Sequence, residues 1–326
     1  MCRQFSTVVV CLLLTTALFA APERVDLGGI VLMVSDARTA QVFHIVDQLS
    51  LWDVFTHKEY ARWAEKTNLL DQHDRELLQR HAELRKKRGW GNGFEPAFLV
   101  DDSIEQAAAK AVASGLLTED EADTERDFLL HFAPKLEPLL QQRHAAIAAV
   151  EEKLVAEHAE LTPLVRQLAH FSEVADPPTV QVFLVANAEE RDGGGGANGG
   201  RIVVEVPLID PIGVLMHESL HQLLRPKEGA MRVAAEAAGL DFIVIKEAIA
   251  YAVYPGILGN TEDGDQLAEE LVQWQLRGVA ASDRFLQFDQ LAVVIRPLLK
   301  AALAHGETIS SFLPKVAAKW HRVAQR

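Results

Sequence analysis

The segment 216–221, Met-His-Glu-Ser-Leu-His, constrains this chain more than any other part of it. His217 and His221 are four residues apart, so on an α-helix they share one face and both imidazoles can bind one metal ion. Glu218 projects from the neighbouring turn, where it can reach a metal-bound water without being a ligand. A Zn²⁺ ion lowers the pKa of its water from about 15.7 towards ~7. The segment therefore predicts a metal ion, a water nucleophile and a general base at one site.

The residues around this segment predict a buried helix. Asp210 is suited to the N-cap and Pro211 to the first helical position, while Pro226 ends the pattern. Between positions 212 and 224 the residues are mostly apolar, and Glu218 is the one charged side chain. A surface helix would carry more Lys, Glu and Arg, so we expect this helix to lie inside a domain.

Catalytic zinc needs a third protein ligand and an open fourth position. One class of zinc enzyme supplies a third His six residues after the second, but Lys227 stands there in this chain. Glu247 is the strongest candidate, because it lies in an apolar stretch 26 residues after His221, where a carboxylate is costly unless it is paired or bound to a metal. The alternatives that the sequence leaves open are Glu236, Glu228 and Asp241.

The chain resembles the gluzincin group of zinc metallopeptidases in two motifs. One is His217-Glu218-x-x-His221, and the other is 247–251, Glu-Ala-Ile-Ala-Tyr, which is similar to the Glu-Gly-x-Ala-x-Tyr pattern of several gluzincins. The resemblance covers about residues 179–255. It implies that His217, His221 and Glu247 bind Zn²⁺, that Glu218 is the general base, and that Tyr251 stabilises an oxyanion. Ala248 replaces the usual glycine and no Asn precedes Glu247, which leaves the family within the group open.

Two segments upstream of the metal motif read as strands. Residues 179–185 and 201–206 are rich in β-branched side chains, and residues 192–200 between them contain six glycines. We expect these strands to form a hairpin, with 202–206 as an edge that pairs with an extended substrate backbone. The glycine segment is then either a mobile flap or a plain hairpin tip.

These patterns predict an α+β fold that is predominantly helical, with a zincin-like catalytic domain, a small sheet or hairpin and an N-terminal helical region. The expected divisions are 1–21, a signal peptide; 22–176, the helical N-terminal region; and 177–326, the catalytic region with C-terminal helices. Pro177 and Pro178 mark the boundary between the last two. A capping box at 118–121 opens one helix, and longer helices near 138–171 are expected to be interrupted at Pro163. Further helices are expected at about 36–52, 57–66, 71–88, 103–114, 266–279, 283–305 and 309–323.

The first 21 residues predict export. Arg3 precedes an apolar run from 8 to 19, and small residues follow at 20 and 21, which is typical of a secretory signal peptide. We therefore expect a secreted or periplasmic protein, without a stable membrane span in the mature chain. Cys2 and Cys11 both fall in this segment, so the mature chain would have no disulfide and no thiol chemistry.

The net charge limits the classes of molecule that this chain can bind. The net charge of −14 would repel phosphate backbones, which argues against nucleic acid as a partner. The resemblance to zinc metallopeptidases implies a peptide or protein substrate. The other histidines show no metal-ligand spacing, although His305 could stabilise an oxyanion. The sequence as a whole predicts a secreted zinc metallopeptidase. The alternative is a zincin-fold scaffold or regulatory protein that binds metal without peptidase activity.

Overall fold

The computed structural model describes residues 21–54, 56–190, 194–254, 256–258 and 284–324. This part of the chain is mostly helical and contains a mixed five-stranded sheet, which confirms the predicted α+β class and its helical predominance. The predicted signal peptide, apart from its last residue, and the helix expected at 266–279 lie outside the described residues.

The sheet has the strand order β1-β2-β3-β5-β4. Its three inner strands, β2, β3 and β5, are parallel, and β1 and β4 pair antiparallel at the two edges. The inner strands are rich in Val, Ile and Leu because both of their faces are covered. The bounds are β1 Glu23–Asp26, β2 Val31–Ser35, β3 Thr179–Ala186, β4 Gly195–Asn198 and β5 Arg201–Val206.

The predicted hairpin between 179–185 and 201–206 is wrong, because β3 and β5 are parallel neighbours. The glycine-rich segment itself contains the edge strand β4, which turns into β5 through Gly199 and Gly200, both with positive φ. Strand β5 therefore lies between β3 and β4, and the prediction that 202–206 is a free edge is also wrong. A strand built from glycines has no side-chain alternation, so the sequence pattern could not reveal it.

The N-terminal region, which the sequence predicts to be helical, also contains the strands β1 and β2 of the sheet. Strand β2 pairs with β3 from Val31 opposite Thr179 to Ser35 opposite Phe183. Strands from both sides of the proline pair at 177–178 thus share one sheet.

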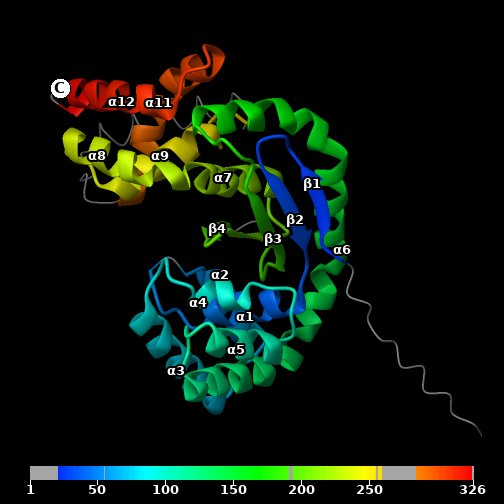
Figure 1. The fold of residues 1–326 in the computed structure, drawn as a ribbon. Helices are drawn as coiled ribbons and strands as arrows, with labels where there is room; N and C mark the ends of the chain where they lie inside the picture. Colours follow the sequence, from blue (N-terminus) through cyan, green and yellow to red (C-terminus); the bar gives the residue numbers. More distant parts are fainter. Residues whose placement is uncertain (1–20, 55, 191–193, 255, 259–283, 325–326) are drawn as a thin grey trace, which may run out of the picture.

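Five helices form what we call the lower lobe, below the sheet in Figure 1. They are α1 Arg38–Leu49, α2 Lys58–Lys66, α3 Gln72–Arg88, α4 Phe94–Phe98 and α5 Ile104–Ala113. Helix α1 is buried along almost its whole length and packs on β3.

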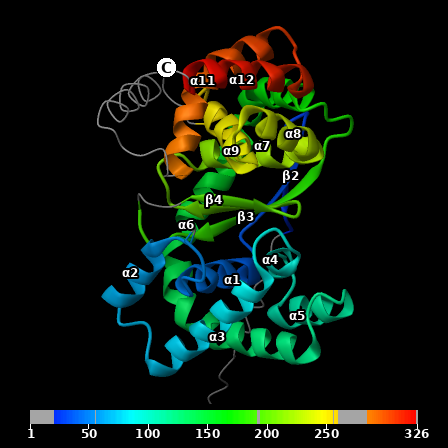
Figure 2. The ribbon, with the colours of Figure 1, turned by 90° about the vertical axis from the view of Figure 1, so that its left-hand side faces the viewer.

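Helix α6, Glu119–Phe171, runs along one side of the molecule past both the lower lobe and the sheet (Figures 1 and 2). Its predicted capping box is confirmed, with the Thr118 side chain accepting from the Glu121 amide. The interruption expected at Pro163 is wrong. Each proline removes one backbone hydrogen bond, but burial of Val165 and Leu168 one turn further on keeps the helix continuous.

The remaining described helices form the upper lobe, on the other side of the sheet (Figure 2). They are α7 Pro211–Leu224, α8 Glu228–Ala238, α9 Phe242–Val253, α11 Arg284–Ala304 and α12 Ile309–Ala324. Helix α7 carries the His217 motif and packs against β4 and β5. Its predicted ends are confirmed, since the Asp210 carboxylate accepts from the Gly213 amide at 2.9 Å and a 3₁₀ turn takes over at Arg225.

Candidate metal centre and its cleft

Three of the residues singled out in the sequence, His217, His221 and Glu247, meet where α7 packs on α9. The Nε2 atoms of His217 and His221 are 3.2 Å apart. Glu247 Oε2 lies 3.5 Å from His217 Nε2 and 3.2 Å from His221 Nε2. This is the one set of three metal-ligating side chains that converges in this way among the described residues.

The triangle of ligand atoms can be compared with a tetrahedral zinc site. With zinc–ligand bonds of about 2.0–2.1 Å, neighbouring ligand atoms are separated by about 3.3 Å. The three edges match that separation. Two imidazole nitrogens at 3.2 Å can also form a hydrogen bond, but only if one of them carries a proton. The donor set therefore fits Zn²⁺ and, equally, a metal-free ion pair.

The electrostatics of these residues follow from their closeness. Burial alone would raise the pKa of the Glu247 carboxyl, but the His221 and His217 imidazoles more than offset it and hold that pKa well below its usual range. Burial would lower the pKa of His217, yet the nearby Glu247 and Glu218 carboxylates raise it. The centre thus keeps Glu247 ionised and ready to face a cation.

Two tyrosines, Tyr251 on α9 and Tyr254 at its C-cap, also contact the ligand residues or their helix. The Tyr254 backbone carbonyl lies 3.4 Å from His217 Nδ1, which favours the tautomer that leaves Nε2 for a metal. The Tyr254 ring lies directly over Gly213, where a Cβ would come within 2.0 Å of a ring atom. Tyr251 packs edge-on against the His217 ring at 4.9 Å and lines the same cleft. His221 differs, since its Nδ1 is buried without a hydrogen-bond partner among the described residues.

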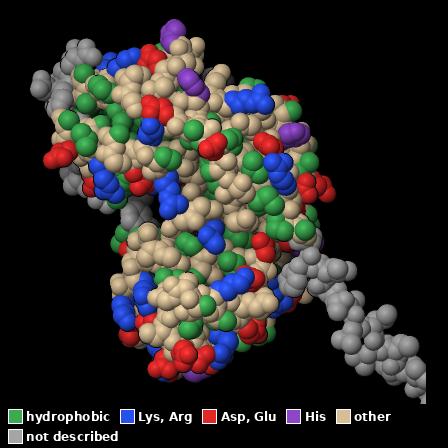
Figure 3. Space-filling model, in the orientation of Figure 1, with side chains coloured by type: hydrophobic (Ala, Val, Ile, Leu, Met, Phe, Trp, Pro, Cys, Tyr) green, Lys and Arg blue, Asp and Glu red, His purple; other side chains and the backbone are tan. Residues whose placement is uncertain are grey.

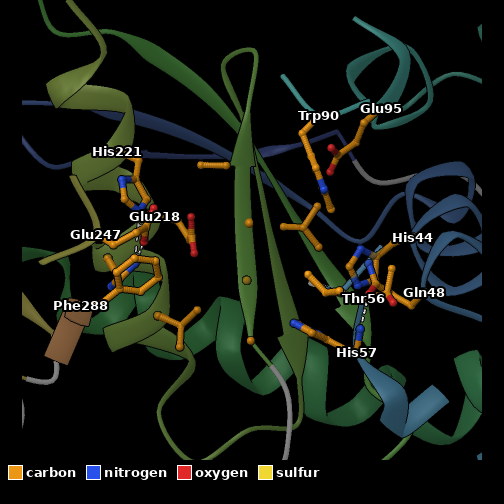
Figure 4. Close-up of a pocket in the computed structure, with 18 of the residues that line it drawn as sticks. His44, Gln48, Thr56, His57, Trp90, Glu95, Glu218, His221, Glu247 and Phe288 are labelled. Atoms are coloured by element: carbon orange, nitrogen blue, oxygen red, sulfur yellow. Dashed lines mark hydrogen bonds and ion pairs between the residues drawn. The ribbon is translucent and has the colours of Figure 1, made fainter. Parts of the chain in front are cut away.

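Figure 4 shows Glu218 beside His221 and Glu247, and its side chain lines the cleft. Glu218 is only 8% exposed, but its carboxylate accepts no hydrogen bond from another described residue. A carboxylate with unoccupied lone pairs at the edge of a cleft can accept a proton from a water or substrate group. The structure therefore separates Glu247, which is paired, from Glu218, which is unpaired.

The cleft has a volume of about 820 Å³ and lies between the upper and lower lobes. The surface is hollowed between the lobes in the space-filling view, on a face where acidic and basic side chains are interspersed (Figure 3). The alternative ligands do not reach it. Glu236 is exposed on α8, Glu228 pairs with Lys246, and Asp241 caps α9. His305 is exposed at the end of α11 and does not line the cleft.

The edge strand β4 runs along the cleft directly beside the general-base candidate. A Cβ at Gly195 would meet Glu218 Cγ at 3.1 Å, Val214 Cγ1 at 2.8 Å and the Val203 carbonyl at 2.8 Å. Only glycine allows the strand backbone to approach α7 this closely. The glycine run that the sequence offered as a flap or a hairpin tip is therefore in part a wall of the site.

A second cluster, which we call the Glu205 cluster, lies on the other face of the sheet edge and consists of Glu205, His44 and His57. Glu205 is fully buried on β5. Its Oε1 accepts from His44 Nε2 at 2.7 Å and from His57 Nδ1 at 2.8 Å, and its Oε2 accepts from the Gly194 amide at 2.8 Å. Figure 4 shows His44 and His57 across the sheet edge from Glu218 and His221.

The Glu205 cluster is not predicted by any spacing in the sequence. Its members lie up to 161 positions apart and no two of them show metal-ligand spacing. One signal was present, because Glu205 interrupts an otherwise apolar strand, and a carboxylate buried in a sheet requires partners. The pKa of Glu205 is held well below its usual range, since the two histidines outweigh the effect of burial.

Comparison with protein-family models, with curated proteins and with solved structures gives no match to this chain. The assignment of function therefore depends on the residues themselves. No helix in the described part of the chain combines the length and the apolar character needed to cross a bilayer.

Proposed function

We propose that this chain is a zinc-dependent metallopeptidase of the gluzincin type with a zincin-like catalytic domain. One observation carries the proposal. The Nε2 atoms of His217 and His221 and the Oε2 atom of Glu247 form a triangle with edges of 3.2–3.5 Å, on helices whose sequences already predicted those ligands. The unpaired Glu218 carboxylate beside this triangle favours an enzyme over the alternative of a metal-binding scaffold, which has no need of a base.

Zinc held by these residues would polarise a scissile carbonyl as a Lewis acid and would lower the pKa of water, which makes the water a better nucleophile. The residues of the chain supply the rest. Glu218 accepts the proton of the attacking water and delivers it to the leaving nitrogen. Glu247 offsets the positive charge of the ion, and the Tyr254 carbonyl orients the His217 ring. Tyr251 lies against His217 in the cleft, where its side chain can contact the developing oxyanion.

The substrate backbone has a place to bind along β4. The Glu205 amide donates to the Gly194 carbonyl at 3.0 Å, so in this antiparallel ladder Gly194 faces β5. The alternation of the ladder then turns the N–H and C=O groups of Gly195 and Ala197 away from β5. An extended peptide can pair with these groups as an added strand. The role expected of 202–206 in the sequence thus passes to β4.

The proposal is tested by the substitution Glu218→Gln, which keeps the size of the side chain but removes its basicity. We expect zinc content and melting temperature close to those of the parent and a turnover lower by about 10² or more. Digestion of a mixture of unstructured peptides, followed by mass spectrometry, measures the turnover. A parent protein that binds one zinc per chain but cleaves no peptide would favour the scaffold.

The same proposal places the protein outside the cytoplasm, as a secreted or periplasmic enzyme. Its support is the sequence of residues 1–21 alone. Sequencing the N-terminus of the protein recovered from its native host tests this, with a start near residue 22 as the expected result.

A further inference from the structure

Side chains of opposite charge lie beside the two ends of β4, on the lower-lobe side of the cleft. At the Gly194 end stands His57, followed by Lys58, and at the Asn198 end stands Glu95. All three side chains line the same cleft as the metal-ligand residues. Figure 4 shows Glu95 and His57 well apart along the sheet edge, with Glu218 on the opposite side between them.

Glu95, on α4, has one carboxylate oxygen available to a ligand. Its Oε2 accepts from Asn198 Nδ2 at 3.2 Å and lies 3.9 Å from Arg85 Nη2. Its Oε1 has no hydrogen-bond partner among the described residues, although the side chain is only 14% exposed. A carboxylate oxygen in this position is well suited to accept from a substrate ammonium group. Trp90, which is 45% exposed, lines the cleft near it.

His57, at the other end, offers a nitrogen. Its Nδ1 is engaged by the buried Glu205 carboxylate, which fixes the ring and favours its cationic form. Its Nε2 lies 3.5 Å from the position a Cβ would take at Gly194 and has no hydrogen-bond partner among the described residues. The exposed Lys58 follows at the first position of α2. These groups are suited to a substrate carboxylate.

The spacing between the two ends sets the length of the ligand. Gly194, which directly precedes β4, and Asn198, at its end, are four residues apart. At the antiparallel-strand rise of about 3.4 Å per residue they lie about 14 Å apart. An extended peptide of about five residues has the same length. Opposite charges at the ends of such a peptide also fix its direction, since only an antiparallel peptide places its amino end at Asn198 and its carboxyl end at Gly194.

We propose that the cleft selects short peptides with free ends, bound antiparallel to β4, with Glu95 receiving the terminal amino group and His57 with Lys58 receiving the terminal carboxylate. This assignment of substrate class rests on the proposed peptidase function. The protein would then be an oligopeptidase that binds both termini of its substrate, while Glu218 faces a peptide bond between the two termini.

Binding to the full-length chain carrying Glu218→Gln tests the proposal, because this variant holds a peptide without cleaving it. The probes are penta-alanine with free ends, the N-acetylated form, the C-amidated form and the doubly blocked form, each titrated calorimetrically. We expect acetylation alone and amidation alone each to raise Kd by about tenfold. Adding Glu95→Gln should remove the effect of acetylation only, and adding His57→Gln together with Lys58→Gln should remove the effect of amidation only.

Matched controls are Glu236→Gln and Lys246→Gln, which remove an exposed carboxylate outside the cleft and an ammonium group that lines it, both away from the proposed contacts. Both should leave the two blocking effects unchanged. The inference is overturned if blocked and free peptides bind within twofold of each other, or if Glu95→Gln abolishes the effect of amidation instead. Peptidase failure is seen separately, as absence of cleavage by the parent protein while end-dependent binding persists.

Discussion

Two clusters, each with two histidines and one glutamate, face each other across the sheet edge, and they are built in opposite ways. In the metal-centre candidate the three ligand atoms point at a common centre, and Glu247 remains 23% exposed to the cleft. In the Glu205 cluster the two histidines point at one carboxylate oxygen, the other oxygen is taken by a backbone amide, and the glutamate is fully buried. The first arrangement leaves room for an ion, and the second has none.

Two clusters with the same residue types can therefore have different roles, because the role depends on where the ligand atoms point. A metal site needs ligand atoms that remain available, with unpaired lone pairs converging on one point. A carboxylate that accepts three N–H bonds is already satisfied and serves to hold its partners in place. The Glu205 cluster thus fastens α1, the start of α2 and the start of β4 to β5, while the metal-centre candidate joins α7 to α9.

The two clusters should differ most in their zinc content. We expect His217→Ala, His221→Ala and Glu247→Ala each to lose most of the bound zinc after dialysis, as measured by elemental analysis, because a site with two protein ligands holds zinc weakly. His44→Ala should keep about one zinc per chain. Loss of zinc in Glu236→Ala, with retention in Glu247→Ala, would contradict the assignment of the third ligand.

Glu218→Gln, predicted above to lower turnover by about 10² or more, is the next largest effect, and it also separates the clusters. The same substitution at Glu205 removes a carboxylate that is not expected to touch substrate. It should therefore act on stability first and on turnover only through the position of His57.

How much of this could be read from sequence depends on how local the information is. The spacing of His217 and His221 and the caps at Asp210 and Pro211 are local, and the structure has them as expected. Glu247 lay further along the chain, but its apolar surroundings made it stand out. These three residues could be predicted from the sequence, because the helical period pairs the two histidines and the apolar surroundings single out the glutamate.

The pairing of the sheet and the Glu205 cluster could not be predicted from the sequence, for physical reasons. Strand β4 has three consecutive non-polar residues without side-chain alternation, so its pairing is decided by neighbours and not by its own sequence. Strand β2 and its partner β3, like His44 and Glu205, are more than a hundred positions apart in the sequence. Nothing in one sequence indicates which distant segments will be adjacent.

The stability of the Glu205 cluster gives the third prediction. Glu205→Gln leaves His44 and His57 facing an amide in a fully buried site, and we expect the free energy of unfolding to fall by about 3 kcal/mol. Urea denaturation in the presence of a zinc chelator measures it without any contribution from metal. Glu247→Gln, measured the same way, should cost about 1 kcal/mol or less, because this carboxylate is partly exposed and has fewer bonds to lose. Equal costs for the two substitutions would show that the clusters are not built differently.

The smallest effect expected is on the pH dependence of stability, and it concerns His57. Burial lowers the pKa of this imidazole, but Glu205 more than offsets burial, so in the folded protein the pKa lies above 6.5. A folded pKa above the unfolded one contributes stability that is complete below about pH 6.5 and is lost as the pH rises through the folded value. In chelator, the melting temperature of the parent should therefore fall more between pH 6 and pH 8 than that of His57→Gln. Parallel curves for the two proteins would mean that Glu205 holds His57 by a neutral hydrogen bond alone, and the second cluster would then differ from the first in charge as well as in geometry.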